Sequence, residues 1–474
     1  MRRAYWIAAV AGLAALAVAE PRVAAVAVAV AVAVAVWRWP TIALHLAAFA
    51  ALAVRPSLDV FSERRVGVGP FALSPAVAFG AAMLWVALVL AARRRRDGLR
   101  TWTDARLFRT HVWLFVAYGI GVYSGWHWYG MTGLAQGIRE LVRVASIVAA
   151  FLVVLWWVET EPAAYRRGWA YLIAGTLVPI AVALTQLVTG RGFLEGGVLR
   201  IQGTFSHPSN FGQYLIPFIV VALAGIASSP ARVRALRLGG AVALSLLVVL
   251  TYSRTALLAL AASLVLLPIL MAVRSGRRPV AQSVIAVGLA GALGWGLAGN
   301  MIRERFAGVS LGGLAWEQAK QGISVNSFTW RLIEWSVLMR LGMAHPLVGH
   351  GGGMTAVLNP MVDERGLPFS AHNDFVKFFV ETGAIGLACY VIYGVGLCAW
   401  ALARARTAGR DTAAAAYAVA ASLLSLMFFT AGVAELAVNT AILHALYGML
   451  ALISVPQPRS VPRPGLIDDS RVAA

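Results

Sequence analysis

Acidic residues are scarce in this chain of 474 residues: 20 aspartates and glutamates stand against 40 lysines and arginines. Charged residues of either sign make up only 13% of the sequence, hydrophobic residues make up 60%, and the mean hydropathy is +0.76. This composition excludes an ordinary soluble domain. Apolar runs of about 20 residues recur along the chain, and each is long enough to cross a bilayer as a helix. Because the runs are continuous rather than short and alternating, we predict an all-α polytopic membrane protein.

Cysteine and the common metal- or nucleotide-binding motifs are also nearly absent. The two cysteines, Cys389 and Cys398, lie in one apolar run, which excludes a disulfide framework and a Cys-x-x-Cys site. No His-Glu-x-x-His, Asp-x-Asp or P-loop pattern occurs. We therefore predict neither a cofactor nor a metal site, so arginines would have to carry the charge of any anionic ligand.

The net charge of +20 would suggest nucleic-acid binding in a soluble protein. Here many basic residues cluster in short loops between apolar runs, where they set topology and contact anionic lipid headgroups. We therefore expect membrane lipids, and no nucleic acid, as partners of these loops. With Arg2 and Arg3 inside, alternation places these arginines on the cytoplasmic face: Arg38, Arg93 to Arg96, Arg100, Arg166, Arg167, Arg232, Arg234, Arg237, Arg274, Arg277, Arg278, Arg404, Arg406 and Arg410.

The apolar runs predict about 12–14 transmembrane helices in a single membrane domain over residues 1–474. The N-terminal run resembles a signal peptide, but the many runs after it favour a retained helix. One large outer loop with short helices is predicted over residues 300–374, and a disordered cytoplasmic tail over 456–474. The predicted spans are 5–19, 23–37, 41–54, 71–92, 112–129, 141–158, 169–187, 211–227, 241–251, 256–273, 280–298, 375–402, 413–433 and 437–455.

Residues 326–387 form a polar segment between two apolar regions, and three of the eight histidines lie in it. Two of them, His345 and His350, accompany the run from Gly349 to Gly353. Each glycine costs about 1 kcal/mol inside a helix, so this run predicts a turn at which backbones approach closely.

The third histidine, His372, precedes a predicted helix start at Asn373. The positive end of that helix favours a neutral imidazole, and a neutral imidazole can accept a proton as a general base does. Asn373, Lys377 and Glu381 share one helix face, and the two glycines that follow, Gly383 and Gly386, predict close packing of another helix. The alternative interpretation is a capped helix with a Lys377–Glu381 pair and no catalytic role.

Two arginines lie where they are costly or conspicuous. Arg254 interrupts an almost continuous apolar block, and an arginine at that depth usually marks function, although it could also snorkel to the headgroups. Arg331 lies among tryptophans, either in an anion site or in an interfacial helix in which it pairs with Glu334. Guanidinium groups bind phosphate strongly through paired donors, so a lipid-linked pyrophosphate fits them.

A second polar segment, residues 189–210, precedes another predicted span and offers Arg200, His207 and Asn210. The same alternation places this segment on the outer face, with Arg254 and residues 300–374. The alternative interpretation is a capped helix start at Ser209 or Asn210.

These residues, in this order, resemble the motifs of the O-antigen ligase and O-antigen polymerase superfamily of bacterial inner-membrane glycosyltransferases. The resemblance covers about residues 200–387 and is carried by Ser253-Arg254, Arg331 with Trp335, His345 to Gly351, His372-Asn373, and Glu381-Thr382-Gly383. It implies glycan transfer from undecaprenyl pyrophosphate to a sugar hydroxyl on the periplasmic side, with inversion and without a metal. It also implies that His372 is the base and that Arg254 and Arg331 hold the diphosphate.

Arg200 is also predicted to bind the diphosphate, because of its position in the chain rather than because of the resemblance. The supporting candidates are His207, Asn210, His345, His350, Asn373, Lys377 and Glu381. We favour a ligase with lipid A-core as acceptor, because the His-Asn and Ser-Arg features are plain and no extra domain is evident. A polymerase that joins lipid-linked repeat units needs the same chemistry. A transporter of lipid-linked oligosaccharide is the alternative from another class, and it would favour charges inside several spans.

Overall fold

The computed structural model describes residues 21–61, 66–68, 71–73, 75–102, 104–161, 163–195, 198–275, 327–362, 366, 368–430 and 440–455. The spans predicted over 5–19 and 280–298, residues 300–326 of the outer loop, and the tail 456–474 lie outside the described residues.

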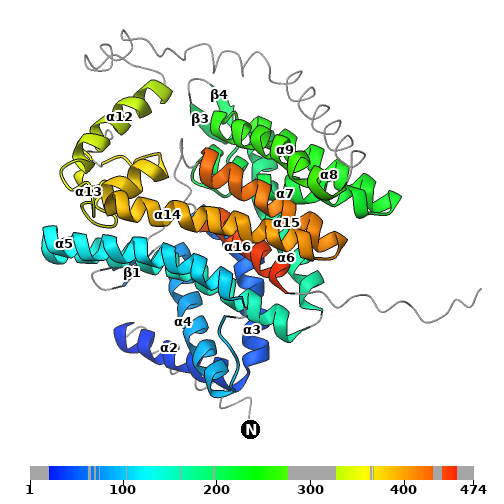
Figure 1. The fold of residues 1–474 in the computed structure, drawn as a ribbon, viewed down its shortest axis with the longest axis horizontal. Helices are drawn as coiled ribbons and strands as arrows, with labels where there is room; N and C mark the ends of the chain where they lie inside the picture. The colour runs from blue at the N-terminus through cyan, green and yellow to red at the C-terminus, as the bar shows by residue number, and fades with distance from the viewer. Residues whose placement is uncertain are drawn as a thin grey trace, which may run out of the picture.

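Helices dominate the described residues, and two short antiparallel hairpins, β1–β2 and β3–β4, accompany them (Figure 1). Among the described residues, eight helical segments are long and apolar enough to cross a membrane, and three shorter helices are also apolar. The predicted all-α polytopic membrane fold is thereby confirmed.

The helices are α2 (Pro21–Arg38), α3 (Pro40–Phe49), α4 (Pro75–Arg96), α5 (Ala105–Thr160), α6 (Ala164–Thr189), α7 (Pro208–Ala224), α8 (Ala231–Leu250), α9 (Arg254–Ser275), α12 (Ser327–Gly342), α13 (Thr355–Leu358), α14 (Asp374–Thr407), α15 (Arg410–Leu423) and α16 (Thr440–Ser454). Short π or 3₁₀ segments are η1 (Ala50–Val54), η2 (Arg55–Phe61), η3 (Ile226–Ser228) and η4 (Leu424–Thr430), and the strands are β1 (Val66–Val68), β2 (Phe71–Leu73), β3 (Phe193–Glu195) and β4 (Val198–Arg200).

Helix α5 is a hairpin of two limbs, because its 56 residues turn at Gly130, where φ is 57° and ψ is −136°. The limbs are nearly in backbone contact: a Cβ on Gly133 would lie 2.0 Å from the carbonyl oxygen of Gly125. Farther from the turn, the rings of His111 and Phe151 stack with centroids 5.6 Å apart. Small residues permit such close helix packing inside a membrane. The spans predicted over 112–129 and 141–158 are therefore the two limbs, joined by a turn rather than a loop.

Helix α14 folds back in the same way at Gly383, where φ is 66° and ψ is −170°. The Tyr390 hydroxyl donates to Asp374 at 3.1 Å, and the rings of Phe378 and Tyr390 stack at 4.0 Å. The prediction of one continuous helix over 375–402 is therefore wrong. Gly383 breaks that helix because glycine adopts a positive φ at little cost.

The glycine-rich segment lies between these two helical turns, as the prediction of close backbone approach requires. The Gly351 N–H donates to the Glu381 carbonyl at 2.8 Å, and the Gly352 N–H donates to the Gly121 carbonyl at 2.9 Å. Gly351 has φ of 118°, and a Cβ there would lie 2.3 Å from the Cα of Gly125. This segment thereby ties α12 to both α5 and α14.

Helix α14 lies beside α5 on one side and α15 on the other, while α12 and α13 lie near one end of α14 and the β3–β4 hairpin lies near one end of α9 (Figure 1). Helix α15 is alanine-rich and buried along its length, so it also packs closely against α7 and α9.

The opposite helix ends carry arginines that were predicted to be cytoplasmic. The contacts that join these ends are Arg94 with Glu159 at 3.0 Å, Trp400 with Asp104 at 2.7 Å, and Arg404 with the Ile453 carbonyl at 2.6 Å.

We expect Gly133→Ala to destabilise the α5 hairpin by about 1–3 kcal/mol, because its Cβ has no room beside Gly125. Gly119→Ala is the matched control, since a Cβ there meets nothing within 4 Å and alanine is the better helix former. Thermal unfolding in detergent measures both variants. Equal midpoints would contradict the close contact of the limbs.

Candidate active site

Basic side chains from separate segments gather at the ends of α7, α9, α12 and α14. Burial and then the charges of Arg200, Arg331 and His372 lower the pKa of His207, so these four groups lie within electrostatic reach of one another. The charge of Arg254 acts in turn on Arg331. The structure therefore brings together the predicted base and all three predicted diphosphate ligands.

A tight turn between α8 and α9 positions Arg254 as the first residue of α9. Tyr252 has φ of 47° in this turn, and Ser253 Oγ accepts a backbone N–H from the first turn of α9 at 3.3 Å. Arg200 is 4% exposed and donates through Nε to the Thr251 carbonyl at 2.8 Å. Arg200 thus fastens the β3–β4 hairpin to the turn that carries Arg254.

Arg331 lies on α12, facing a like charge. Burial lowers the pKa of Arg331, the neighbouring Arg254 adds to the effect, and Glu334 opposes it. Two half-buried cations held near each other are typical of a site that binds an anion. Two guanidinium groups offer several planar donors, which suit the oxygens of a diphosphate.

Contacts on both sides fix His372. Its φ of 49° is uncommon for a residue other than glycine, and such strained conformations cluster at functional sites. The Trp335 indole N–H donates to the Ala371 carbonyl at 2.9 Å, and Asn373 accepts a backbone N–H of α14 at 3.1 Å. The predicted helix start at Asn373 is confirmed, and the ring of Trp330 meets the imidazole edge-on at 5.8 Å.

Glu334 is a site residue for which the sequence suggests only a pairing with Arg331. Its side chain is 0% exposed. Its Oε2 lies 3.3 Å from Nδ1 of His372, and its Oε1 accepts a hydrogen bond from Asn359 Nδ2 at 2.9 Å. The feature of the sequence that could have indicated Glu334 is its position about one helical turn after Arg331.

His207 caps α7, because its Nδ1 accepts the Ser209 N–H at 3.2 Å. The cap thus precedes Pro208 instead of lying at Ser209 or Asn210, since proline is favoured as the first helical residue. Burial lowers the pKa of His207 to about 4, and the charges of Arg200 and other nearby groups contribute to this decrease. Asn210 follows in the first turn of α7.

The other two histidines of the polar segment contact the turn of α5. His350 bonds through Nδ1 to the Tyr129 hydroxyl at 2.6 Å and through Nε2 to the Leu341 carbonyl at 2.9 Å. His345 stacks on Trp128 with 4.0 Å between ring centroids. These contacts hold the glycine-rich segment against α5.

Lys377 and Glu381 belong to a buried charged group between α5 and α14. Lys377 Nζ lies 3.9 Å from Glu140, which also pairs with Arg143. Glu381 lies within electrostatic reach of both Lys377 and Glu140.

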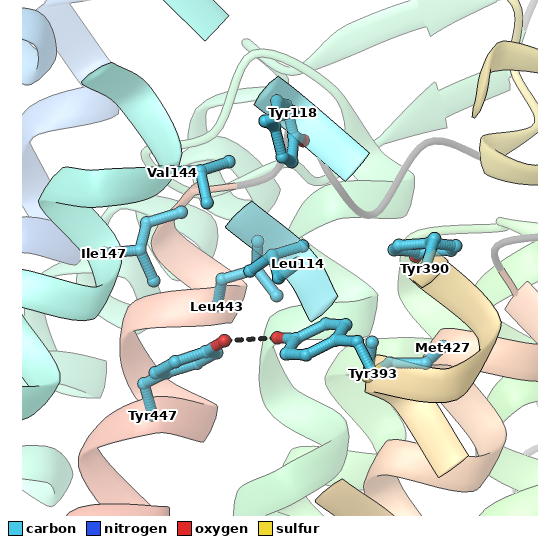
Figure 2. A pocket seen from close by; sticks show the side chains of 9 residues that line it. All are labelled: Leu114, Tyr118, Val144, Ile147, Tyr390, Tyr393, Met427, Leu443 and Tyr447. Carbon is cyan, nitrogen blue, oxygen red and sulfur yellow. Dashed lines mark hydrogen bonds between the residues drawn. The ribbon is translucent and has the colours of Figure 1, made fainter. Parts of the chain in front are cut away.

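Helices α5, α14 and α16 and the segment η4 line a small cavity of about 30 Å³ (Figure 2). Tyr118, Tyr390, Tyr393 and Tyr447 surround it, and the hydroxyls of Tyr393 and Tyr447 contact each other. The cavity has room for one or two water molecules. It is too small for a sugar or a diphosphate, so it is separate from the candidate site.

Fold and site together define a polytopic membrane protein with an arginine cluster beside a histidine at one set of helix ends. Residues 239–391 match a family model described as O-antigen ligase. The match confirms the resemblance seen in the motifs, and it includes Arg254, Arg331 and His372. A search of curated proteins gave no match.

Acidification should destabilise the protein through His207. Its pKa is about 4 in the fold against an ordinary 6.5, so between these values the unfolded chain binds a proton that the folded chain does not. Stability therefore falls as the pH drops from 6.5 toward 4, by at most about 3 kcal/mol.

Thermal unfolding in detergent at pH 7 and pH 5 measures this loss. His207→Asn can still cap α7 but does not titrate, so it should show a smaller difference between the two pH values. The same difference in both proteins would show that His207 does not carry the effect.

Proposed function

We propose that the protein is an O-antigen ligase of the bacterial inner membrane. It transfers a polysaccharide from undecaprenyl pyrophosphate to a sugar hydroxyl on lipid A-core, by a metal-independent inverting reaction at the periplasmic face. The observation that carries the proposal is the meeting of Arg254, Arg331 and His372, which come from three separate segments. The match over residues 239–391 supports ligase- or polymerase-type chemistry in general.

The basic loops support the proposed orientation. Arg94 and Arg404 lie at the helix ends opposite to the site, and the positive-inside rule assigns such loops to the cytoplasm. The candidate site then faces the periplasm, where the outer ends of the helices meet the lipid headgroups.

The proposed reaction is a single displacement. The acceptor hydroxyl gives its proton to Nε2 of His372 while its oxygen forms a bond to the anomeric carbon of the donor sugar. The bond from that carbon to the pyrophosphate oxygen breaks, and undecaprenyl pyrophosphate leaves with the electron pair. Arg254 and Arg331 stabilise the charge on the leaving group. Attack opposite to the leaving group inverts the anomeric configuration.

A transporter of lipid-linked oligosaccharide is the second candidate, and the buried charges of Glu140, Lys377 and Glu381 favour it. Purified protein in proteoliposomes separates the candidates. Lipid A-core that gains glycan indicates a ligase, a longer lipid-linked polymer indicates a polymerase, and movement of the donor across the bilayer without transfer indicates a transporter.

His372→Ala should lower the transfer rate by about 10²–10⁴-fold, the usual contribution of a positioned base. The variant should still insert and fold, because the Asn373 cap does not involve the imidazole. Glycan transfer by purified protein measures the effect. Near-normal transfer by folded His372→Ala would remove this base from the mechanism.

Arg254→Lys and Arg331→Lys should each reduce transfer strongly, because lysine keeps the charge but cannot bind two phosphate oxygens with a planar fork. Arg340→Lys is the matched control, since Arg340 lies exposed on the same helix as Arg331. Donor titrations should show weaker donor binding for the two site variants alone. Full activity in both site variants would indicate that these arginines serve topology rather than the donor.

A further inference from the structure

Each oxygen of the Glu334 carboxylate has a separate partner. Oε1 accepts from Asn359 Nδ2 at 2.9 Å, and Oε2 faces His372 Nδ1 at 3.3 Å. A carboxylate only accepts hydrogen bonds, so the His372 nitrogen that faces it must carry the hydrogen. The other ring nitrogen, Nε2, is then the one with a free electron pair in the neutral imidazole.

The Asn359 amide is itself held in one orientation. Its Nδ2 also donates to the Phe369 carbonyl at 3.0 Å, and its Oδ1 accepts the Met361 N–H at 3.0 Å. A flipped amide would lose both bonds and place oxygen against the Phe369 carbonyl. Asn359 therefore always presents N–H to Glu334, and the partner atom on residue 334 must be an acceptor.

We propose that Glu334 is a positioning residue that holds His372 in the tautomer with hydrogen on Nδ1 and so reserves Nε2 for the acceptor's proton. This inference rests on the proposed function. Among the described residues, the charged or titratable groups near His372 include Glu334 and Arg331 from α12 and His207 from the start of α7. Glu334 is the one among these three that carries negative charge.

The proton balance follows from this arrangement. The acceptor's proton moves to Nε2, and His372 becomes an imidazolium with hydrogen on both nitrogens. Glu334 keeps its charge and stabilises this cation, as the carboxylate does in a serine-protease triad. After the glycosylated product leaves, Nε2 returns its proton to solvent.

Glu334→Gln tests the tautomer directly. Asn359 would hold the new amide by its oxygen, so the amide N–H₂ would face Nδ1 of His372. The ring would then carry its hydrogen on Nε2, and Nε2 could not accept a proton. We expect transfer to fall by about 10²–10⁴-fold, as for loss of the base itself, while KM for the lipid-linked donor changes little.

Glu334→Asp is the matched variant, because it keeps the charge and presents only acceptors, although it is one methylene shorter. A positioning role predicts more activity in Glu334→Asp than in Glu334→Gln. A purely structural role predicts the reverse order, because glutamine is nearly isosteric with glutamate. Thermal unfolding of both variants shows whether each is folded.

A second readout needs no activity. Solid-state ¹⁵N NMR of histidine-labelled protein in lipid identifies the His372 signals as those that His372→Ala lacks. We expect hydrogen on Nδ1 in the wild type and on Nε2 in Glu334→Gln. The same tautomer in both proteins, or equal transfer by wild type and Glu334→Gln, would overturn the inference.

The two proposals fail in distinguishable ways. If the wild type transfers no glycan to lipid A-core or to a second lipid-linked glycan, the proposed function fails, whatever the ¹⁵N signals show. If the wild type transfers glycan and Glu334→Gln does so equally well, the proposed function stands and the role of Glu334 fails alone.

Discussion

Two guanidinium groups of like charge, Arg254 and Arg331, lie within electrostatic reach of each other at one end of the helical bundle. Burial and the neighbouring cation both lower the pKa of Arg331, so the arrangement has a cost in free energy. Glu334, fully buried beside Arg331, offsets part of that cost. A multiply charged anion between the arginines would offset the remainder, which makes a diphosphate a fitting ligand.

Backbone contacts, together with side-chain packing, bring these charges to the histidine. The glycine-rich segment bonds to the α5 hairpin at Gly121 and to the turn of α14 at Glu381, and a side chain at Gly351 would collide with α5. Helix α12 is thereby fixed relative to α14, and Arg331 is fixed relative to His372. The glycine-rich segment, predicted as a turn, thus holds α12 against α5 and α14, and its glycines allow the close backbone contacts on which the position of Arg331 depends.

The apolar runs and the charged loops predict the all-α membrane fold, and the motifs predict that Arg254, Arg331 and His372 share a site. The turn at Gly383 could not be predicted, because the apolar pattern continues through that glycine. The spacing of apolar residues does not show where a helix reverses its direction. Glu334 and Asn359 escape prediction for another reason. They are 25 residues apart, and their contact exists only once the loop has folded back onto α12. Sequence patterns therefore locate the groups that we propose to react but miss the residues that we propose to orient them.

We propose that Arg254, Arg331 and His372 act on one lipid diphosphate, and a structure with that ligand bound would show whether they do. Electron cryomicroscopy of the protein in nanodiscs with undecaprenyl pyrophosphate would locate the phosphates. We expect density for the diphosphate between the two guanidinium groups, with the imidazole of His372 beside its sugar-bearing end. Diphosphate density bound elsewhere, with neither Arg254 nor Arg331 in contact with it, would contradict the proposed donor site.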